Sequence, residues 1–153
     1  MDQQLTGSPG EKMGAWGIGT FDDDTALDFL EGELIPRPDP RAVMRRAFED
    51  ALSAEYVDYL AGQSVLVSAA VIEAVLERKP LTLRENEKWT QWRVAIGTLD
   101  FSSLKAIGER ACLRVCAEGS ELFELWSENE ELFPDWKQGI ESLAESLAST
   151  RPL

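Results

Sequence analysis

The sequence predicts an all-α protein, a compact bundle of about six or seven helices around one buried central helix. Along most of the chain, apolar residues recur every three or four positions, which is the period of an amphipathic helix. Residues 63–79 are apolar nearly all round, as in a helix that lies at the centre of a bundle. Apolar residues make up 44% of the 153 residues, an ordinary share for a globular domain.

The chain is expected to contain one helical domain, residues 13–150, preceded by a tail. Residues 1–12 are rich in Gln, Ser, Gly and Pro and are expected to be disordered. The glycine-rich stretch that follows predicts irregular backbone. Within it, Trp16, Ile18 and Phe21 are expected to insert into the core and anchor the start of the fold.

Two helices are expected before the central one. The first runs from about Asp23 to Leu34, and its acidic opening residues suit the positive end of a helix dipole and can cap it. Pro36 ends this helix, and Asp39-Pro40 starts the next, with proline at a favoured first position. The residues expected to face inward are Ala26, Leu27, Leu30 and Leu34, followed by Met44, Ala47, Phe48, Ala51 and Leu52.

The central helix is expected over residues 63–79. Its many β-branched residues make a strand the competing interpretation, but its length and its alanines favour a helix. It is too short, and too interrupted by serines, to be expected to span a bilayer. The preceding residues 55–62 fit either a short extended piece or a helical turn that ends at Gly62.

The remaining helices are predicted from their caps. Thr82 and Glu85 form a capping-box pattern that starts a helix. A long helix is expected over 103–118, after which Gly119 provides a C-cap and Ser120 caps a short helix. These helices and the last one carry Trp89, Trp92, Ile96, Leu104, Ile107, Ala111, Val115, Leu122, Leu125, Trp126, Trp136, Ile140, Leu143 and Leu147.

The charge of the chain indicates the kind of partner to expect. There are 28 acidic and 15 basic residues, which give a formal net charge of −13. This balance argues against nucleic acid, whose phosphates require clustered Lys and Arg, and against an anionic membrane surface. It favours a basic protein partner. Residues 1–12 lack the apolar stretch of a signal peptide, so we expect a cytoplasmic protein.

No catalytic constellation is recognisable in the sequence. Histidine, the commonest general base and metal ligand, is absent, so a metal site would have to use carboxylates. We therefore predict no catalytic residues, no metal ligands and no cofactor. Cys112 and Cys116 lie four apart and are interpreted as small buried apolar residues, since a redox pair would favour the C-x-x-C spacing.

An acidic cluster near the N-terminus is the first candidate binding site. It includes Asp22, Asp23, Asp24 and Asp28, and no Lys or Arg falls within residues 22–33. Such a cluster can receive a basic partner, although helix capping and a solvated helix face explain the same residues. The aspartates also argue against phosphate binding by the preceding glycines, because negative charge already occupies this helix start.

A second candidate lies within residues 118–135, which also lack Lys and Arg. Glu121, Glu124 and Glu128 surround Trp126, and aromatic anchors inside a charged rim are typical of protein interfaces. The alternative is that the aromatic residues belong to the core while the carboxylates only solvate the outer face. Spacing alone leaves both interpretations open.

Two motifs resemble a bacterial family of unknown function. Residues 13–21, MGAWGIGTF, are followed by Asp22 and Asp24, and the family's members typically open MGAWG-x-G-x-F before an acidic pair. Residues 119–126, GSELFELW, resemble the family's ending before a last amphipathic helix. The likeness covers roughly residues 13–148. It implies a helical bacterial domain and brings no activity.

Three functional hypotheses follow. The first is an acidic cytoplasmic binding protein with a basic protein partner, of which a toxin-neutralising, immunity-type protein is one form. The second is a carboxylate-metal-dependent enzyme or small-molecule binder. The third is a structural homo-oligomer subunit that buries exposed Trp residues on self-association.

Overall fold

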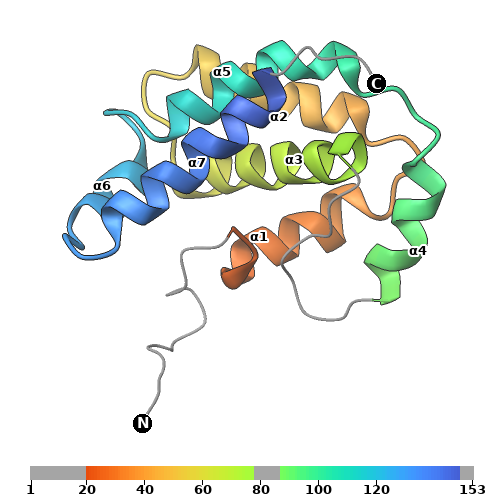
Figure 1. Ribbon diagram of the computed structural model, residues 1–153, viewed down its shortest axis with the longest axis horizontal. Helices are drawn as coiled ribbons and strands as arrows, with labels where there is room; N and C mark the ends of the chain where they lie inside the picture. The colour runs from red at the N-terminus through yellow and green to blue at the C-terminus, as the bar shows by residue number, and fades with distance from the viewer. Residues whose placement is uncertain (1–19, 78–86, 149–153) are drawn as a thin grey trace, which may run out of the picture.

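The computed structural model describes residues 20–77 and 87–148, which form a bundle of helices (Figure 1). The helices are α1 (Asp24–Phe29), α2 (Arg41–Ser53), α3 (Tyr59–Glu77), α4 (Glu87–Ile96), α5 (Lys105–Val115), α6 (Glu121–Ser127) and α7 (Phe133–Ala148). Three short helical segments accompany them: η2 (Thr20–Asp22), η3 (Leu30–Leu34) and η4 (Ser102–Leu104). The predicted all-α bundle is therefore confirmed.

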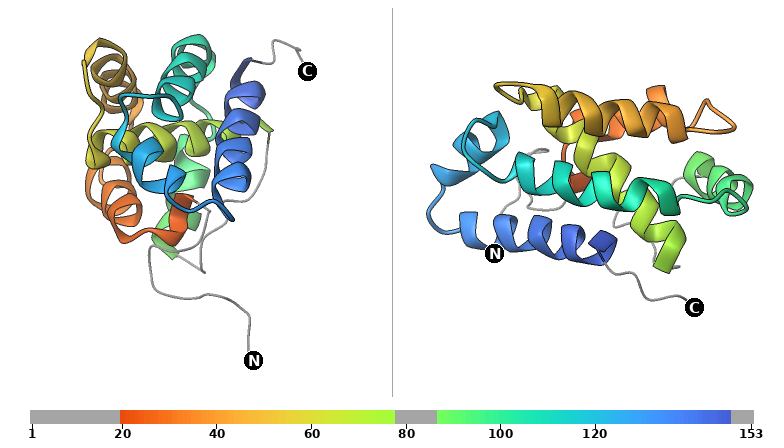
Figure 2. Two further views of the ribbon diagram at one scale, coloured as in Figure 1. Left: turned by 90° about the vertical axis from the view of Figure 1, so that its left-hand side faces the viewer. Right: turned by 90° about the horizontal axis from the view of Figure 1, so that it is seen from above.

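Helix α3 lies at the centre of the bundle. Helices α1, α2, α5 and α7 all pack against it, and α5 also packs against α2 and α7. Figures 1 and 2 show α1 on one side of α3 and helices α2 and α5 on the opposite side. Residues Gly62 to Ala69 of α3 are all buried, which agrees with the central position predicted from its apolar composition.

The start of α3 differs from the prediction. The helix begins at Tyr59, so Gly62 lies within its first turn and does not end a preceding element. A Cβ atom at Gly62 would lie 2.8 Å from Leu122 Cδ1, which shows that α6 approaches α3 closely at this glycine. Close packing against α6 thus explains the glycine at position 62, which helix propensity alone suggests is a helix end.

The caps predicted for α1 and α6 are confirmed. The Asp23 carboxylate accepts hydrogen bonds from the Thr25 and Ala26 N–H groups, and the Ser120 hydroxyl accepts one from the Phe123 N–H. The helix predicted to reach Leu34 does so through η3, a π-helical continuation of α1.

The helix expected over 103–118 is shorter than predicted. Its α-helical part is α5, which ends at Val115, and the chain then turns through Gly119 at a positive φ of 89°. The turn brings the chain to a parallel β-bridge between Val57 and Ser120.

The apolar stripes are largely as predicted. In α7, the residues Trp136, Ile140, Leu143 and Leu147 are buried, as are Trp89, Trp92 and Ile96 in α4. Phe21 is also buried. The predictions for residues 1–12, for Trp16 and Ile18, and for the capping box at 82–85 lie outside the described residues.

Among the described residues, α3 alone has the length and composition of a membrane-crossing helix. However, 61% of its apolar window is buried inside the bundle, as in the core helix of a globular domain. Its apolar surface is accounted for by packing against the surrounding helices.

Candidate protein-binding surface

The two predicted acidic segments meet at Tyr59, the first residue of α3. The Tyr59 hydroxyl donates a hydrogen bond to the carboxylate of Asp23, the residue that directly precedes α1. The Tyr59 backbone N–H donates to Glu121 Oε1 in α6 at 2.9 Å. Segments far apart in the sequence therefore flank a single residue. We call residues 22–28, 56–60 and 121–128 together the Tyr59 junction.

A β-bridge fixes α6 against the start of α3. The Val57 N–H donates to the Gly119 carbonyl oxygen at 2.8 Å, and the Glu121 N–H donates to the Val57 carbonyl oxygen at 2.8 Å. Val57 and Ser120 are fully buried at this point. The bridge satisfies backbone groups that would otherwise be buried without partners, so it holds α6 in a defined position.

The Arg114 side chain supports the same connection. Its guanidinium donates to the carbonyl oxygens of Glu55, Glu118 and Gly119 at 3.2 Å and of Ala54 at 3.5 Å. A guanidinium carries five N–H donors in a planar fork, which suits several carbonyl acceptors at once. The positive charge of Arg114 is thus directed to backbone oxygens.

Neutral donors orient the carboxylates of the junction. The Tyr56 hydroxyl donates to Glu124 Oε1 at 2.9 Å, and this hydrogen bond is the main cause that raises the pKa of Tyr56 to about 12. Burial, followed by the hydrogen bond to Asp23, raises the pKa of Tyr59 to about 12 as well. Because a protonated tyrosine has no charge, these bonds position the carboxylates without a neutralising cation.

The predicted aspartates occupy different environments. Asp23 is only 6% exposed and accepts hydrogen bonds from Thr25, Ala26 and Tyr59, so it supports the fold. Asp22, Asp24 and Asp28 are exposed, so they are the members of this cluster that a partner can reach.

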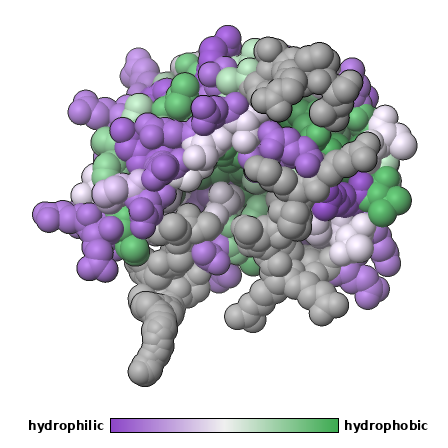
Figure 3. All heavy atoms as spheres, viewed as in Figure 1, coloured by the Kyte–Doolittle hydropathy of each residue, from purple (hydrophilic) through white to green (hydrophobic). Residues whose placement is uncertain are grey.

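The predicted glutamates divide in a similar way. Glu121 is half-buried against Tyr59, whereas Glu124 and Glu128 are exposed. In the described part of the chain, these three glutamates make no ion pair. Figure 3 shows the face of the molecule that is seen in Figure 1, and hydrophilic residues gather on its left, over α6 and the start of α7. Their charge therefore remains available to a partner.

Trp126 has a packing role. Its ring stacks on that of Trp136, with centroids 5.9 Å apart and planes 11° from parallel. Phe133 contacts Trp136 and Phe123, and so extends this aromatic cluster between α6 and α7. Trp126 is half-buried and Trp136 buried, which favours the interpretation that these rings hold two helices together.

The junction also exposes apolar residues that sequence reasoning missed. Tyr56, Leu60 and Leu125 have 47%, 58% and 46% of their surface exposed, respectively. Residues 55–62 fit two conformations from sequence alone, so the directions of Tyr56 and Leu60 were not predictable. Leu125 belongs to a helix of only seven residues, too short for its apolar positions to define a unique buried face.

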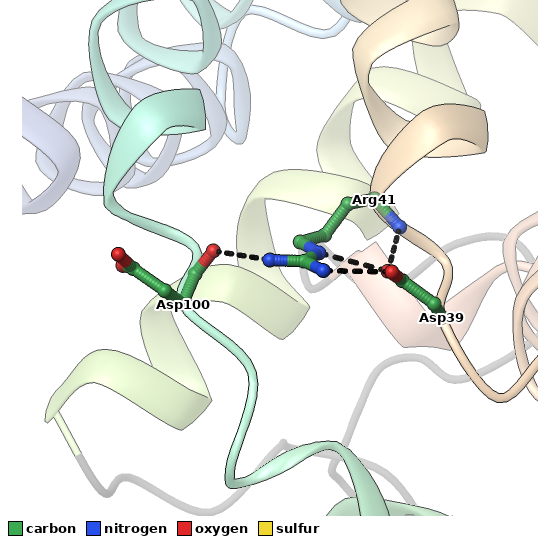
Figure 4. A network of polar contacts seen from close by, with 3 residues as sticks. All are labelled: Asp39, Arg41 and Asp100. Atoms are coloured by element: carbon green, nitrogen blue, oxygen red, sulfur yellow. Dashed lines mark hydrogen bonds and ion pairs between the residues drawn. The ribbon is translucent and has the colours of Figure 1, made fainter.

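At the N-terminal end of α2, away from the junction, a carboxylate is paired with a cation (Figure 4). The Arg41 guanidinium forms an ion pair with Asp39 at 2.7 Å and donates to the Asp100 carbonyl oxygen at 3.1 Å. Hydrogen bonds from the Arg41 side chain and backbone hold the pKa of Asp39 at about 2, below its usual value of 3.8. Asp39 is thus paired with a cation, unlike Glu121, Glu124 and Glu128 at the Tyr59 junction.

A carboxylate metal site would require several acidic side chains or thiols close together. In residues 20–77 and 87–148, no group of three or more Cys, Asp or Glu side chains is placed to hold a metal ion. Cys112 and Cys116 are free and buried, as predicted. Burial raises the pKa of both thiols, which disfavours the reactive thiolate.

The homo-oligomer hypothesis expects exposed tryptophans, and four of the five tryptophans lie in the described part of the chain. Trp89, Trp92 and Trp136 are buried, and Trp126 is half-buried against Trp136. The described part of the chain therefore exposes no tryptophan in the manner that this hypothesis requires.

These features define an all-helical domain with an acidic surface built around one tyrosine. The chain belongs to the family described as a domain of unknown function, DUF4259, whose model matches residues 14–139. The match extends from Gly14 into α7, and it agrees with the family of unknown function that the resemblance implied. Comparisons with curated proteins and with solved structures gave no match.

Proposed function

We propose that this protein is an acidic binding protein and that the Tyr59 junction receives a basic protein partner. The observation that carries the proposal is the pair of hydrogen bonds from Tyr59 to Asp23 and Glu121, which brings two acidic segments into one surface. A surface of one charge raises the association rate of an oppositely charged partner and selects against like-charged ones.

The charge of these segments supports the proposal. Residues 22–33 contain six acidic residues and no basic one, and residues 118–135 contain seven acidic residues and no basic one. Charges separated by more than about 8 to 10 Å are largely screened at physiological salt, so a strong local field requires close acidic groups. At the junction, Glu121, Glu124 and Glu128 supply such groups and make no ion pair within the described part of the chain.

A toxin-neutralising role is the particular form that we propose for this binding in a bacterial cytoplasm. A protein that blocks a basic active site needs a stable, negatively charged surface and no catalytic residues of its own. The small domain, its net charge of −13 and its lack of histidine agree with such a role. A toxin or secretion gene beside the gene for this chain would support this form of the proposal.

Capture of a partner from the native host, with matched variants as bait, tests the proposal. The junction variant carries Asp24→Asn, Asp28→Asn and Glu128→Gln, all at exposed positions. The control variant carries Glu87→Gln, Glu109→Gln and Glu145→Gln on α4, α5 and α7, and so loses the same charge elsewhere.

We expect wild type and the control variant to recover the same partner at low salt and the junction variant to lose it. Recovery of no specific partner by wild type would contradict a binding function. Equal recovery by all three baits would show that the partner binds elsewhere.

A further inference from the structure

Exposed apolar side chains gather on the same segments as the acidic groups of the junction. Of the five large apolar residues that are exposed in the described part of the chain, Tyr56, Leu60 and Leu125 belong to the Tyr59 junction. The other two, Val94 and Leu113, lie on α4 and α5. A single exposed leucine is ordinary at a protein surface, so what distinguishes the junction is that three of the five fall on segments that also carry acidic groups.

The junction holds these residues on a rigid support. The hydroxyl of Tyr56 donates a hydrogen bond to Glu124 in α6. Leu60 directly follows Tyr59, whose backbone N–H donates to Glu121. Leu125 lies one helical turn after Glu121. Apolar contacts on a rigid support cost little ordering entropy on binding, which is the property of an interface anchor.

From this arrangement, and resting on the proposed function, we infer that the junction binds an amphipathic helix whose apolar residues are flanked by Lys or Arg. The apolar positions of such a helix would cover Leu60 and Leu125, and its cations would lie near Asp28, Glu124 and Glu128. The described residues form no sheet whose edge an extended peptide could join, which favours helical packing over strand addition.

Two synthetic peptides of the same composition separate this inference from charge attraction alone. The first is a helix of about five turns made of Leu and Lys, with the leucines on one face. The second contains the same residues in an order that spreads the leucines around the helix. Calorimetry measures the affinity of each peptide for the full chain and for the single variants Leu60→Ser and Leu125→Ser.

We expect the amphipathic peptide to bind about tenfold more tightly than its scrambled form. Each leucine variant should lose most of that advantage. The matched controls Val94→Ser and Leu113→Ser remove exposed apolar groups of 77% and 44% exposure outside the junction and should retain it. An unchanged thermal unfolding midpoint in each variant confirms that the fold is intact.

Three results would overturn the inference. If both peptides bind wild type equally and the leucine variants change nothing, an amphipathic partner is excluded while a charge-driven proposed function stands. If the control variants weaken binding as much as Leu60→Ser and Leu125→Ser, the peptide binds elsewhere. If neither peptide binds wild type, the amphipathic inference and the proposed basic partner both fail.

Discussion

The Tyr59 junction and the N-terminal end of α2 differ in the partners of their carboxylates. At the N-terminal end of α2, Asp39 forms an ion pair with Arg41, so the charge of Asp39 is balanced. At the junction, Glu121 accepts a hydrogen bond from a backbone N–H and Glu124 accepts one from a tyrosine hydroxyl, and both donors are neutral. Both sites hold their side chains in place, but in the described part of the chain Glu121 and Glu124 have no cation as a partner.

The position of Arg114 sharpens this contrast. It lies close to the junction, yet its guanidinium binds backbone carbonyl oxygens between the segments that precede α3 and α6. The cation therefore supports the geometry of the acidic surface while its hydrogen bonds leave the nearby carboxylates unpaired. A surface ion pair such as Asp39–Arg41 adds little stability, whereas four hydrogen bonds to one cation, two of them partly buried, add more.

Replacing Arg114 should have the largest effect. Arg114→Ala leaves up to four carbonyl oxygens without this donor, and we expect a loss of about 2 kcal/mol in the free energy of unfolding. Arg114→Lys should recover only part of it, because an ammonium cannot reproduce the planar fork. Urea unfolding measures both effects. The exposed Arg110→Ala on the same helix is the control, and an equal loss there would contradict the role given to Arg114.

The turn at Gly119 should show the next largest effect. Its φ of 89° is unfavourable for residues with a Cβ, and a Cβ here would lie 3.2 Å from Arg114 Nη2. We expect Gly119→Ala to reduce the free energy of unfolding by about 1 to 2 kcal/mol.

A matched glycine in α7 provides the control for that turn. A Cβ at Gly139 would meet nothing within 4 Å. Gly139→Ala should stabilise the protein by up to about 1 kcal/mol, because alanine is the better helix former. Similar effects at the two glycines, measured by urea unfolding, would show that the turn at Gly119 is not strained by a side chain.

The tyrosines report directly on the neutral donors of the junction. The chain has only two tyrosines, and both have a pKa raised to about 12. Ultraviolet absorbance of tyrosinate should therefore show no titration near the ordinary value of 10 in wild type. Glu124→Gln should bring the pKa of Tyr56 down, since its acceptor carboxylate is the main cause of the shift. A titration near 10 for both residues in wild type would refute these hydrogen bonds.

The smallest effect is expected at the Asp39–Arg41 ion pair, before and at the start of α2. Asp39 has its pKa lowered from 3.8 to about 2 in the folded state, so the unfolded state binds more protons between these values. Its contribution to stability is present above about pH 4 and is lost as the pH falls towards 2. Asp39→Asn should therefore make unfolding less dependent on pH in this interval, as followed by circular dichroism. An unchanged dependence would show that the ion pair does not form in solution.

Local patterns predicted the elements whose determinants are close in sequence. The 4, 3, 4 spacing from Trp136 to Leu147 identified the buried face of α7, and Asp23 and Ser120 were recognisable as caps. Gly62 misled the prediction because its role is set by Leu122, which lies sixty positions later. Propensity describes a residue in its own segment and carries no information about a distant helix.

The candidate site was predictable in part for the same reason. Charge counts identified the acidic segments, but they did not show that Tyr59 joins them or that Asp23 is buried. From sequence, Trp126 was open to interpretation as a packing residue or as an interface anchor, and its stacking on Trp136 favours the packing role. Contacts between distant segments decide which members of a charged cluster face solvent.

We propose that the exposed carboxylates of the Tyr59 junction, rather than the net charge of the chain, attract a basic partner. Its most direct test is the salt dependence of affinity for the amphipathic Leu–Lys peptide, measured by calorimetry on wild type and on the two triple variants. We expect the affinity of wild type to fall steeply with salt and the control variant to keep this dependence. The junction variant should bind more weakly at low salt and lose much of that dependence. Indistinguishable affinity and salt dependence in the two variants would show that the junction carboxylates do not attract the partner.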